Sequence, residues 1–231
     1  MAKHFNIADL FEMVADKVPT RDALVCGDQR ATYAELDQRA NRLAHYLASQ
    51  GVKAGDHVGL YMYNCNEYLE GMMACFKIRA VPINVNYRYV QEELLYIFDN
   101  ADMVACIHHQ EFSPHIAEVK DSAPDLKTFI HVTDDSGADA AAIGSVEYEA
   151  SMEGQSDARD FEERSDDDLF LLYTGGTTGM PKGVPRGHLV GDHFEQVSDI
   201  EMLCHISFSE PGTDHVYGDR PHFLGKMGSV P

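Results

Sequence analysis

The run from Tyr173 to Val184, YTGGTTGMPKGV, contains the residue types that proteins use to hold phosphate groups. It combines four glycines, three threonines and one lysine. Glycines let backbone N–H groups approach a ligand, hydroxyl groups donate further hydrogen bonds, and the ammonium group of Lys182 adds a mobile positive charge. The run therefore predicts a phosphate-binding loop, and a surface turn that merely tolerates glycine is the alternative.

The loop differs from the Walker A motif of kinases and other nucleotide-hydrolysing proteins. That motif places Gly-Lys before Ser or Thr at the start of a helix, whereas Lys182 lies between Pro181 and Gly183. The sequence thus disfavours a kinase and predicts a phosphate site that needs no helix N-terminus.

An apolar segment, Leu169–Tyr173, comes directly before the loop and predicts a buried strand that delivers it. The three acids before this strand, Asp166, Asp167 and Asp168, are interpreted as an exposed lead-in rather than a metal site. The acidic stretches Thr133–Gly144 and Gly154–Asp168 are interpreted as solvated loops around a short helix near Val146–Met152.

Further upstream, predicted strands alternate with predicted helices. Asn6 can cap a helix that ends at Pro19, and Thr32 with Glu35 forms a capping box for a helix that stops at Gly51. The remaining predicted strands are Ala23–Cys26, His57–Tyr63, Val81–Asn84, Met103–Ile107 and Phe129–Val132, and the remaining predicted helices are Glu67–Arg79, Gln91–Asn100 and Phe112–Ser122. This alternation predicts an α/β fold with a doubly wound, largely parallel sheet and flanking helices, whose ligands bind beyond the carboxyl ends of the strands.

The composition excludes several classes of partner. With 38 acidic against 18 basic residues and a formal net charge of -20, the surface repels nucleic acid and anionic membranes. No stretch has the length of a membrane span. The five cysteines form no CxxC pair, which favours a reducing cytoplasm, and no metal site is predicted because no HExxH motif or Cys/His ligand spacing occurs.

Three upstream segments, together with the loop, resemble the N-terminal part of the adenylate-forming acyl-CoA synthetases of the AMP-binding superfamily. These segments are TYAELDQRANRLAHYL (Thr32–Leu47), GVKAGDHVGLYMYN (Gly51–Asn64) and VPINVNYRYVQEELLYIFDNADMVACI (Val81–Ile107). The resemblance covers residues 5–184, and these segments are most similar to bacterial synthetases for fatty or steroid-derived acids. Asn84, Asn86, Tyr87 and Arg88 are interpreted as shaping a turn and not as substrate contacts.

The resemblance implies ATP, Mg²⁺ and coenzyme A as cofactors and a carboxylic acid as substrate. In the family the loop holds the β- and γ-phosphates of ATP while the carboxylate attacks the α-phosphorus, and coenzyme A then cleaves the acyl-adenylate. Many members have Ser where this chain has Gly175. The residues implied to bind phosphate are Thr174, Gly175, Gly176, Thr177, Thr178, Gly179 and Lys182.

The sequence after Val184 no longer resembles the family, whose members continue with acyl, adenine and ribose sites and a mobile C-terminal domain that carries the catalytic lysine. We therefore expect residues 1–184 to be the N-terminal part of a synthetase domain, 185–231 to be a divergent tail with a possible helix over Phe194–Leu203, and the chain alone to be inactive or impaired. A non-catalytic nucleotide-binding or partner-binding module is the alternative. A homo-oligomer or association with a full-length synthetase stays open.

The junction itself suggests a frameshift. Pro185-Arg186-Gly187-His188-Leu189 can be encoded by CCA CGA GGA CAT CTN, which reads CAC GAG GAC ATC when it is shifted by one base. That frame encodes His-Glu-Asp-Ile, which related synthetases carry shortly after this point. We hypothesise that the tail is an out-of-frame translation, and a genuine alternative C-terminus is the rival.

Overall fold

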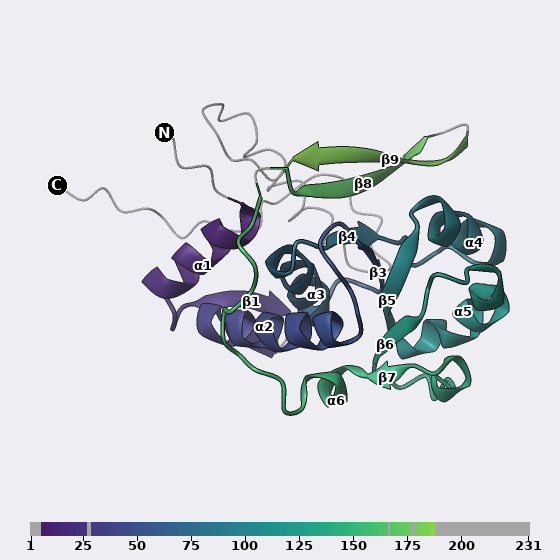
Figure 1. Ribbon diagram of the computed structural model, residues 1–231. Coiled ribbons are helices and arrows are strands. Elements are labelled where there is room, and N and C mark those ends of the chain that lie inside the picture. Colours follow the sequence, from purple (N-terminus) through teal and green to yellow (C-terminus); the bar gives the residue numbers. More distant parts are fainter. Residues whose placement is uncertain (1–5, 27–28, 166, 177–178, 188–231) are drawn as a thin grey trace, which may run out of the picture.

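The described part of the chain forms an α/β fold around one seven-stranded sheet, in the strand order β7-β6-β5-β3-β4-β8-β9 (Figure 1). The computed structural model describes residues 6–26, 29–165, 167–176 and 179–187. All neighbouring strands are parallel except β8 and β9, and β1 pairs with β2 in a separate antiparallel hairpin. The strands are β1 Asp22–Cys26, β2 Gln29–Thr32, β3 His57–Tyr61, β4 Val81–Asn84, β5 Met103–His109, β6 Thr128–Val132, β7 Val146–Glu147, β8 Leu169–Gly176 and β9 Gly179–Gly187.

Helices cover both faces of the sheet, so the predicted doubly wound, largely parallel architecture is confirmed. The helices are α1 Ile7–Lys17, α2 Tyr33–Ser49, α3 Asn66–Lys77, α4 Gln91–Asn100, α5 Ser113–Val119 and α6 Tyr148–Met152, with 3₁₀ turns at Gln110–Phe112, Lys120–Ser122 and Ala141–Ile143. None of the helices in the described ranges is long and apolar enough to cross a membrane.

Alternating residues of the central strands feed two hydrophobic cores. Leu60 of β3 and Ile107 of β5 pack with α2 and α3 on one face, whereas Tyr61 and Cys106 pack with α4 and α5 on the other. This alternation follows from the two-residue period of a strand, and it places α3 and α4 on opposite sides of β4.

The two predicted helix caps are confirmed. The Asn6 side chain accepts a hydrogen bond from the backbone of Ala8 at 3.0 Å, and the Thr32 hydroxyl accepts one from the backbone of Glu35 at 3.2 Å. The predicted helix over Glu67–Arg79 ends earlier, because Arg79 adopts a left-handed backbone with φ of 63°. The predicted helix over Phe194–Leu203 lies outside the described residues.

The predicted solvated loop over Gly154–Asp168 is mostly exposed, but parts of it are attached to the fold. Figure 1 shows this segment running past α2 and α1 toward β8, and ion pairs attach it to both helices. Arg159 Nη2 lies 2.9 Å from a carboxylate oxygen of Asp37, and Arg164 Nη2 lies 2.7 Å from one of Glu12. One carboxylate on each helix, Glu12 on α1 and Asp37 on α2, attracts these two arginines and holds the segment against the helices before β8 begins.

The prediction that the acids before β8 are exposed is wrong for Asp168, which is 8% exposed. Its carboxylate accepts hydrogen bonds from Arg79 Nε at 2.9 Å and from Asn6 Nδ2 at 3.0 Å. Asp167 is exposed as predicted, and Asp166 lies outside the described residues. The carboxylate thus joins the ends of α1 and α3 to the first residue of β8.

Candidate phosphate-binding hairpin

The predicted phosphate loop is the tip of the β8–β9 hairpin. In the register of the hairpin Thr174 lies opposite Lys182 and Gly176 lies opposite Gly179, while Thr177 and Thr178 fall outside the described residues. The structure therefore brings the first threonine and the lysine of the motif together across two strands.

The expectation of an open loop from Thr174 onward is wrong, because Thr174, Gly175 and Gly176 extend β8 and Gly179 already begins β9. Ladder hydrogen bonds of an antiparallel pair occupy part of the backbone N–H groups on each strand. Part of the backbone N–H groups of β8 and β9 is therefore engaged within the hairpin and is not available to a ligand.

Lys182 is a cation on strand β9 of the hairpin. Its side chain is exposed, and none of the ion pairs among the described residues includes it. It is available to an anionic ligand.

Helix α4 contacts the hairpin on both sides of Lys182. Tyr96 Oη donates a hydrogen bond to the carbonyl oxygen of Pro181 at 3.0 Å, and Tyr173 Oη donates one to Asn100 Oδ1 at 3.1 Å. Burial raises the pKa of Tyr173, so its hydroxyl keeps the proton that it donates. Sequence reasoning missed Tyr96 and Asn100, since neither belongs to a motif.

Gly183 lies in close contact with the ring of Tyr173. A Cβ atom at this position would lie 3.1 Å from Cζ of the Tyr173 ring, closer than most real Cβ contacts. A side chain at this position would therefore require the ring of Tyr173 or the backbone of β9 to move by a few tenths of an ångström.

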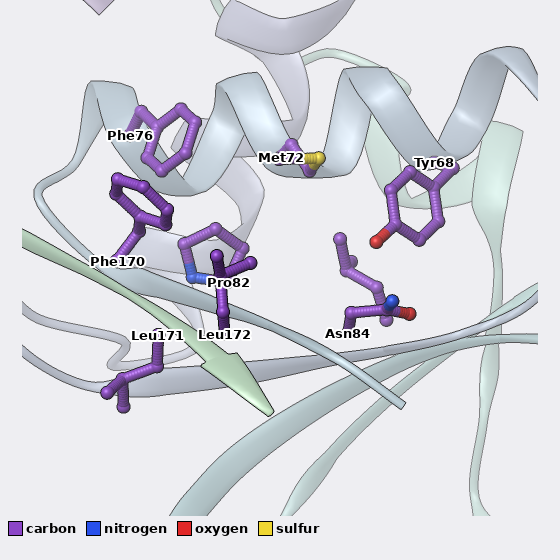
Figure 2. A pocket seen from close by; sticks show the side chains of 9 residues that line it. Tyr68, Met72, Phe76, Pro82, Asn84, Phe170, Leu171 and Leu172 are labelled. Atoms are coloured by element: carbon purple, nitrogen blue, oxygen red, sulfur yellow. The ribbon is translucent and has the colours of Figure 1, made fainter. Parts of the chain in front are cut away.

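The attachment of β8 to the rest of the sheet is short, and a small pocket lies beside it. Figure 2 shows Tyr68, Met72 and Phe76 of α3 facing Pro82 and Asn84 of β4 and residues of β8. The β4–β8 ladder consists of one residue pair, Ile83 with Leu171. The backbone N–H groups of Val81 and Val85 point toward β3. Because successive residues of a strand direct their backbone groups to opposite neighbours, residue 82 faces β8. This residue is a proline, which has no N–H group to donate to β8.

The pocket is lined by apolar side chains and by the polar groups of Tyr68 and Asn84, and no charged residue lines it. It therefore lacks the cationic groups that a phosphate needs and is a packing gap at the seam between β4 and β8. Among the described residues no group of three His, Cys, Asp or Glu side chains lies together as a metal site.

The turn after β4 forms as predicted. Asn86 Oδ1 accepts a hydrogen bond from the backbone of Arg88 at 3.0 Å, and the Asn86 carbonyl accepts one from Tyr89 at 2.9 Å. The Arg88 guanidinium group lies over the ring of Tyr87, 5.4 Å from its centroid. These contacts account for the asparagine and the arginine by local structure.

Similarity to a known family extends over most of the chain. Residues 11–217 match the family described as "AMP-binding enzyme". The chain belongs to this family. The match begins within α1 and continues past Val184.

This chain has relatives among bacterial CoA ligases. It is 56% identical over 183 residues to a "3-oxocholest-4-en-26-oate--CoA ligase" of Rhodococcus rhodochrous, an alignment that covers 79% of this chain and 33% of the relative. It is 49% identical over 192 residues to a "Medium/long-chain-fatty-acid--CoA/3-oxocholest-4-en-26-oate--CoA ligase" of Mycobacterium marinum, covering 81% of this chain and 35% of the relative. The chain thus spans about a third of the length of these relatives.

Solved structures of adenylate-forming enzymes share the fold. The anthranilate CoA ligase AuaEII in complex with anthranoyl-AMP superimposes with a TM-score of 0.74 at 24% identity, over 81% of this chain and 36% of that one. The apo structure of Mycobacterium smegmatis MbtA gives a TM-score of 0.71 at 26% identity, over 80% of this chain and 34% of that one.

Proposed function

We propose that this chain supplies the N-terminal, phosphate-binding part of an ATP-dependent ligase that joins a carboxylic acid to coenzyme A. The observation that carries the proposal is the 56% identity to a steroid-acid CoA ligase over 183 residues. The names of the relatives support a fatty or steroid-derived acid as the substrate class. The free thiols of Cys75 and Cys106 accord with a reducing cytoplasm.

The hairpin fits the β- and γ-phosphates of ATP. It presents an exposed lysine, a threonine in the opposite register position and a glycine-rich tip, the donor set that a polyphosphate requires. In the proposal the phosphates bind to Thr174, Gly175, Gly176, Thr177, Thr178, Gly179 and Lys182. Mg²⁺, when it is bound to the phosphate oxygens, neutralises part of their charge.

The reaction proposed for the complete ligase has two steps. The substrate carboxylate attacks the α-phosphorus of ATP and pyrophosphate leaves, and then the thiol of coenzyme A displaces AMP to form the thioester. The hairpin acts in the first step by orienting the triphosphate, with Lys182 offsetting charge on the departing pyrophosphate. The sites for adenine, ribose and acid are proposed to lie in the two thirds of the relatives that this chain does not span.

A chimera tests this function. The segment of the Rhodococcus relative that aligns with this chain is replaced by the matching residues of this chain, and formation of 3-oxocholest-4-en-26-oyl-CoA is measured. We expect a ligase that is active with the steroid acid and is impaired at least tenfold by Lys182→Ala, since an electrostatic contact in the transition state is worth several kcal/mol. A chimera that folds and binds the acid but forms no thioester would contradict the proposal.

The same chimera distinguishes the proposed function from the alternative, a non-catalytic binding module. Such a module would bind ATP in the isolated chain and yet fail to support catalysis in the chimera.

A further inference from the structure

We propose that helix α4 is a positioning element for the hairpin, which holds Lys182 in place through Tyr96 and Asn100. The inference rests on the proposed function, because it assigns a role to these residues in presenting Lys182 to phosphate. Neither side chain belongs to the glycine-rich motif, and Tyr96 is 85 residues away from its partner Pro181 in the sequence.

The contacts of α4 flank Lys182 on both sides. The carbonyl group of the preceding residue, Pro181, accepts the 3.0 Å hydrogen bond from Tyr96. The residue after Lys182, Gly183, lies against the ring of Tyr173, whose hydroxyl is bound to Asn100 at 3.1 Å. The backbone of Lys182 is therefore fixed at both ends while its side chain stays exposed.

The hairpin needs such an anchor because the sheet holds it weakly. β9 pairs only with β8 among the described strands, and β8 pairs with β4 through the single residue pair Ile83–Leu171. A two-stranded hairpin is marginally stable by itself, so contacts outside the ladder decide how firmly it is held.

Helix α4 is a rigid platform for this purpose. Leu94, Ile97 and Phe98 of this helix are at most 1% exposed and pack in the core formed with α5 and the sheet. Tyr96 and Asn100 lie on the same helix as these buried anchors and reach the hairpin from it. An ordering contact made before the ligand arrives reduces the entropy that binding must overcome.

Amide hydrogen exchange of the free chain tests the anchor without any ligand. In Tyr96→Phe we expect the slowest amides of β9 to exchange about fivefold faster relative to those of β5. The loss of one neutral hydrogen bond raises the population of the open, exchange-competent state of β9 by about this factor. The matched control is Tyr46→Phe on α2, since the Tyr46 hydroxyl makes no hydrogen bond within the part of the chain that the structure describes. Equal exchange in the two variants would overturn the proposal.

A double-mutant cycle with Mg²⁺-pyrophosphate separates positioning from a general effect on the fold. We expect Tyr96→Phe to weaken binding about fivefold in the chain with Lys182 and to leave it unchanged in the Lys182→Ala background. An equal loss in both backgrounds would show that Tyr96 does not act through Lys182 and would overturn the positioning role.

Failure of the proposed function gives a different result. If the unmodified chain and the chimera both fail to bind Mg²⁺-pyrophosphate, the phosphate role is wrong for the hairpin as a whole. Faster exchange in Tyr96→Phe would then still establish the attachment of β9 to α4. Unchanged exchange would refute this attachment in addition to the phosphate role.

Discussion

Lys77 is the buried cation on which the packing of α1, α2 and α3 depends, and replacing it with methionine is the most informative perturbation of the fold. Its side chain is 0% exposed, and its Nζ atom lies 2.6 Å from Glu12 and 2.8 Å from Asp37. Methionine fills a similar volume but leaves the two carboxylates with one positive charge fewer in a place where water is largely excluded.

The expected loss depends on the cations that remain around the two carboxylates. Removing one partner from a buried ion pair costs about 3–5 kcal/mol. Arg164 stays 2.7 Å from Glu12 and Arg159 stays 2.9 Å from Asp37, so the lower end of the range applies. We therefore expect the free energy of unfolding to fall by about 3 kcal/mol, which lowers the urea midpoint by about 1.5 M for a slope of about 2 kcal/mol per M.

Urea unfolding followed by circular dichroism measures this change. Lys17→Met is the matched control, because Lys17 is an exposed lysine at the end of α1 and we expect a change of at most about 0.5 kcal/mol there. Adding Glu12→Gln to Lys77→Met should restore part of the lost stability, since it removes one of the two carboxylates that have lost a cation. A loss of less than about 1 kcal/mol in Lys77→Met would refute the reasoning, because it would mean that water solvates the cluster.

Two further predictions concern the cores on either side of the sheet. Burial lowers the pKa of His108 to about 4, so the unfolded chain binds more protons than the folded chain between about pH 6.5 and 4. Stability therefore falls as the pH is lowered through this range, by up to about 1.4 kcal/mol per pH unit. His108→Asn should flatten this slope in urea titrations, and an unchanged slope would refute the prediction. Gly71→Val should cost about 1–3 kcal/mol or more, because a Cβ there would lie 3.1 Å from Leu60 Cδ2; an unchanged urea midpoint would contradict this.

Local signals in the sequence were sufficient for most of the elements. The capping boxes at Asn6 and Thr32 involve residues at most three positions apart, and both form. The predicted bounds of β4 and α4 agree with the structure, because turn residues and an apolar period mark their ends. The alternation of strands and helices then leaves few possible topologies, and the doubly wound sheet is one of them.

Contacts between distant residues could not be predicted in this way. Asp168 was predicted to be exposed because it follows two other acids, yet its partner Arg79 lies 89 residues away. The apolar run Leu169–Tyr173 was predicted to be a buried strand, but Leu169 is 44% exposed while Phe170 is 3% exposed. Near the edge of the sheet only one face of β8 is well covered, and the sequence of β8 carries no signal for which neighbours cover it.

For the candidate site, the residue types of the motif predict phosphate as the ligand, and this stays a prediction. They carry no information on which residues hold the hairpin in place. Glycine, threonine and lysine are recognisable as phosphate-binding types from the motif alone. The hydroxyl group of Tyr96, which holds Pro181, has no pattern of its own in the sequence, because its role depends on where α4 lies relative to β9.

The β8–β9 hairpin of this chain is proposed to bind the phosphates of ATP, and calorimetric titration of the chain with Mg²⁺-ATP measures this binding. We predict saturable binding that weakens as salt rises and that falls at least tenfold in Lys182→Ala, while Lys53→Ala, an exposed lysine on the loop before β3, leaves it unchanged. Absence of binding, or binding that is equal in the chain and in Lys182→Ala, would contradict the claim.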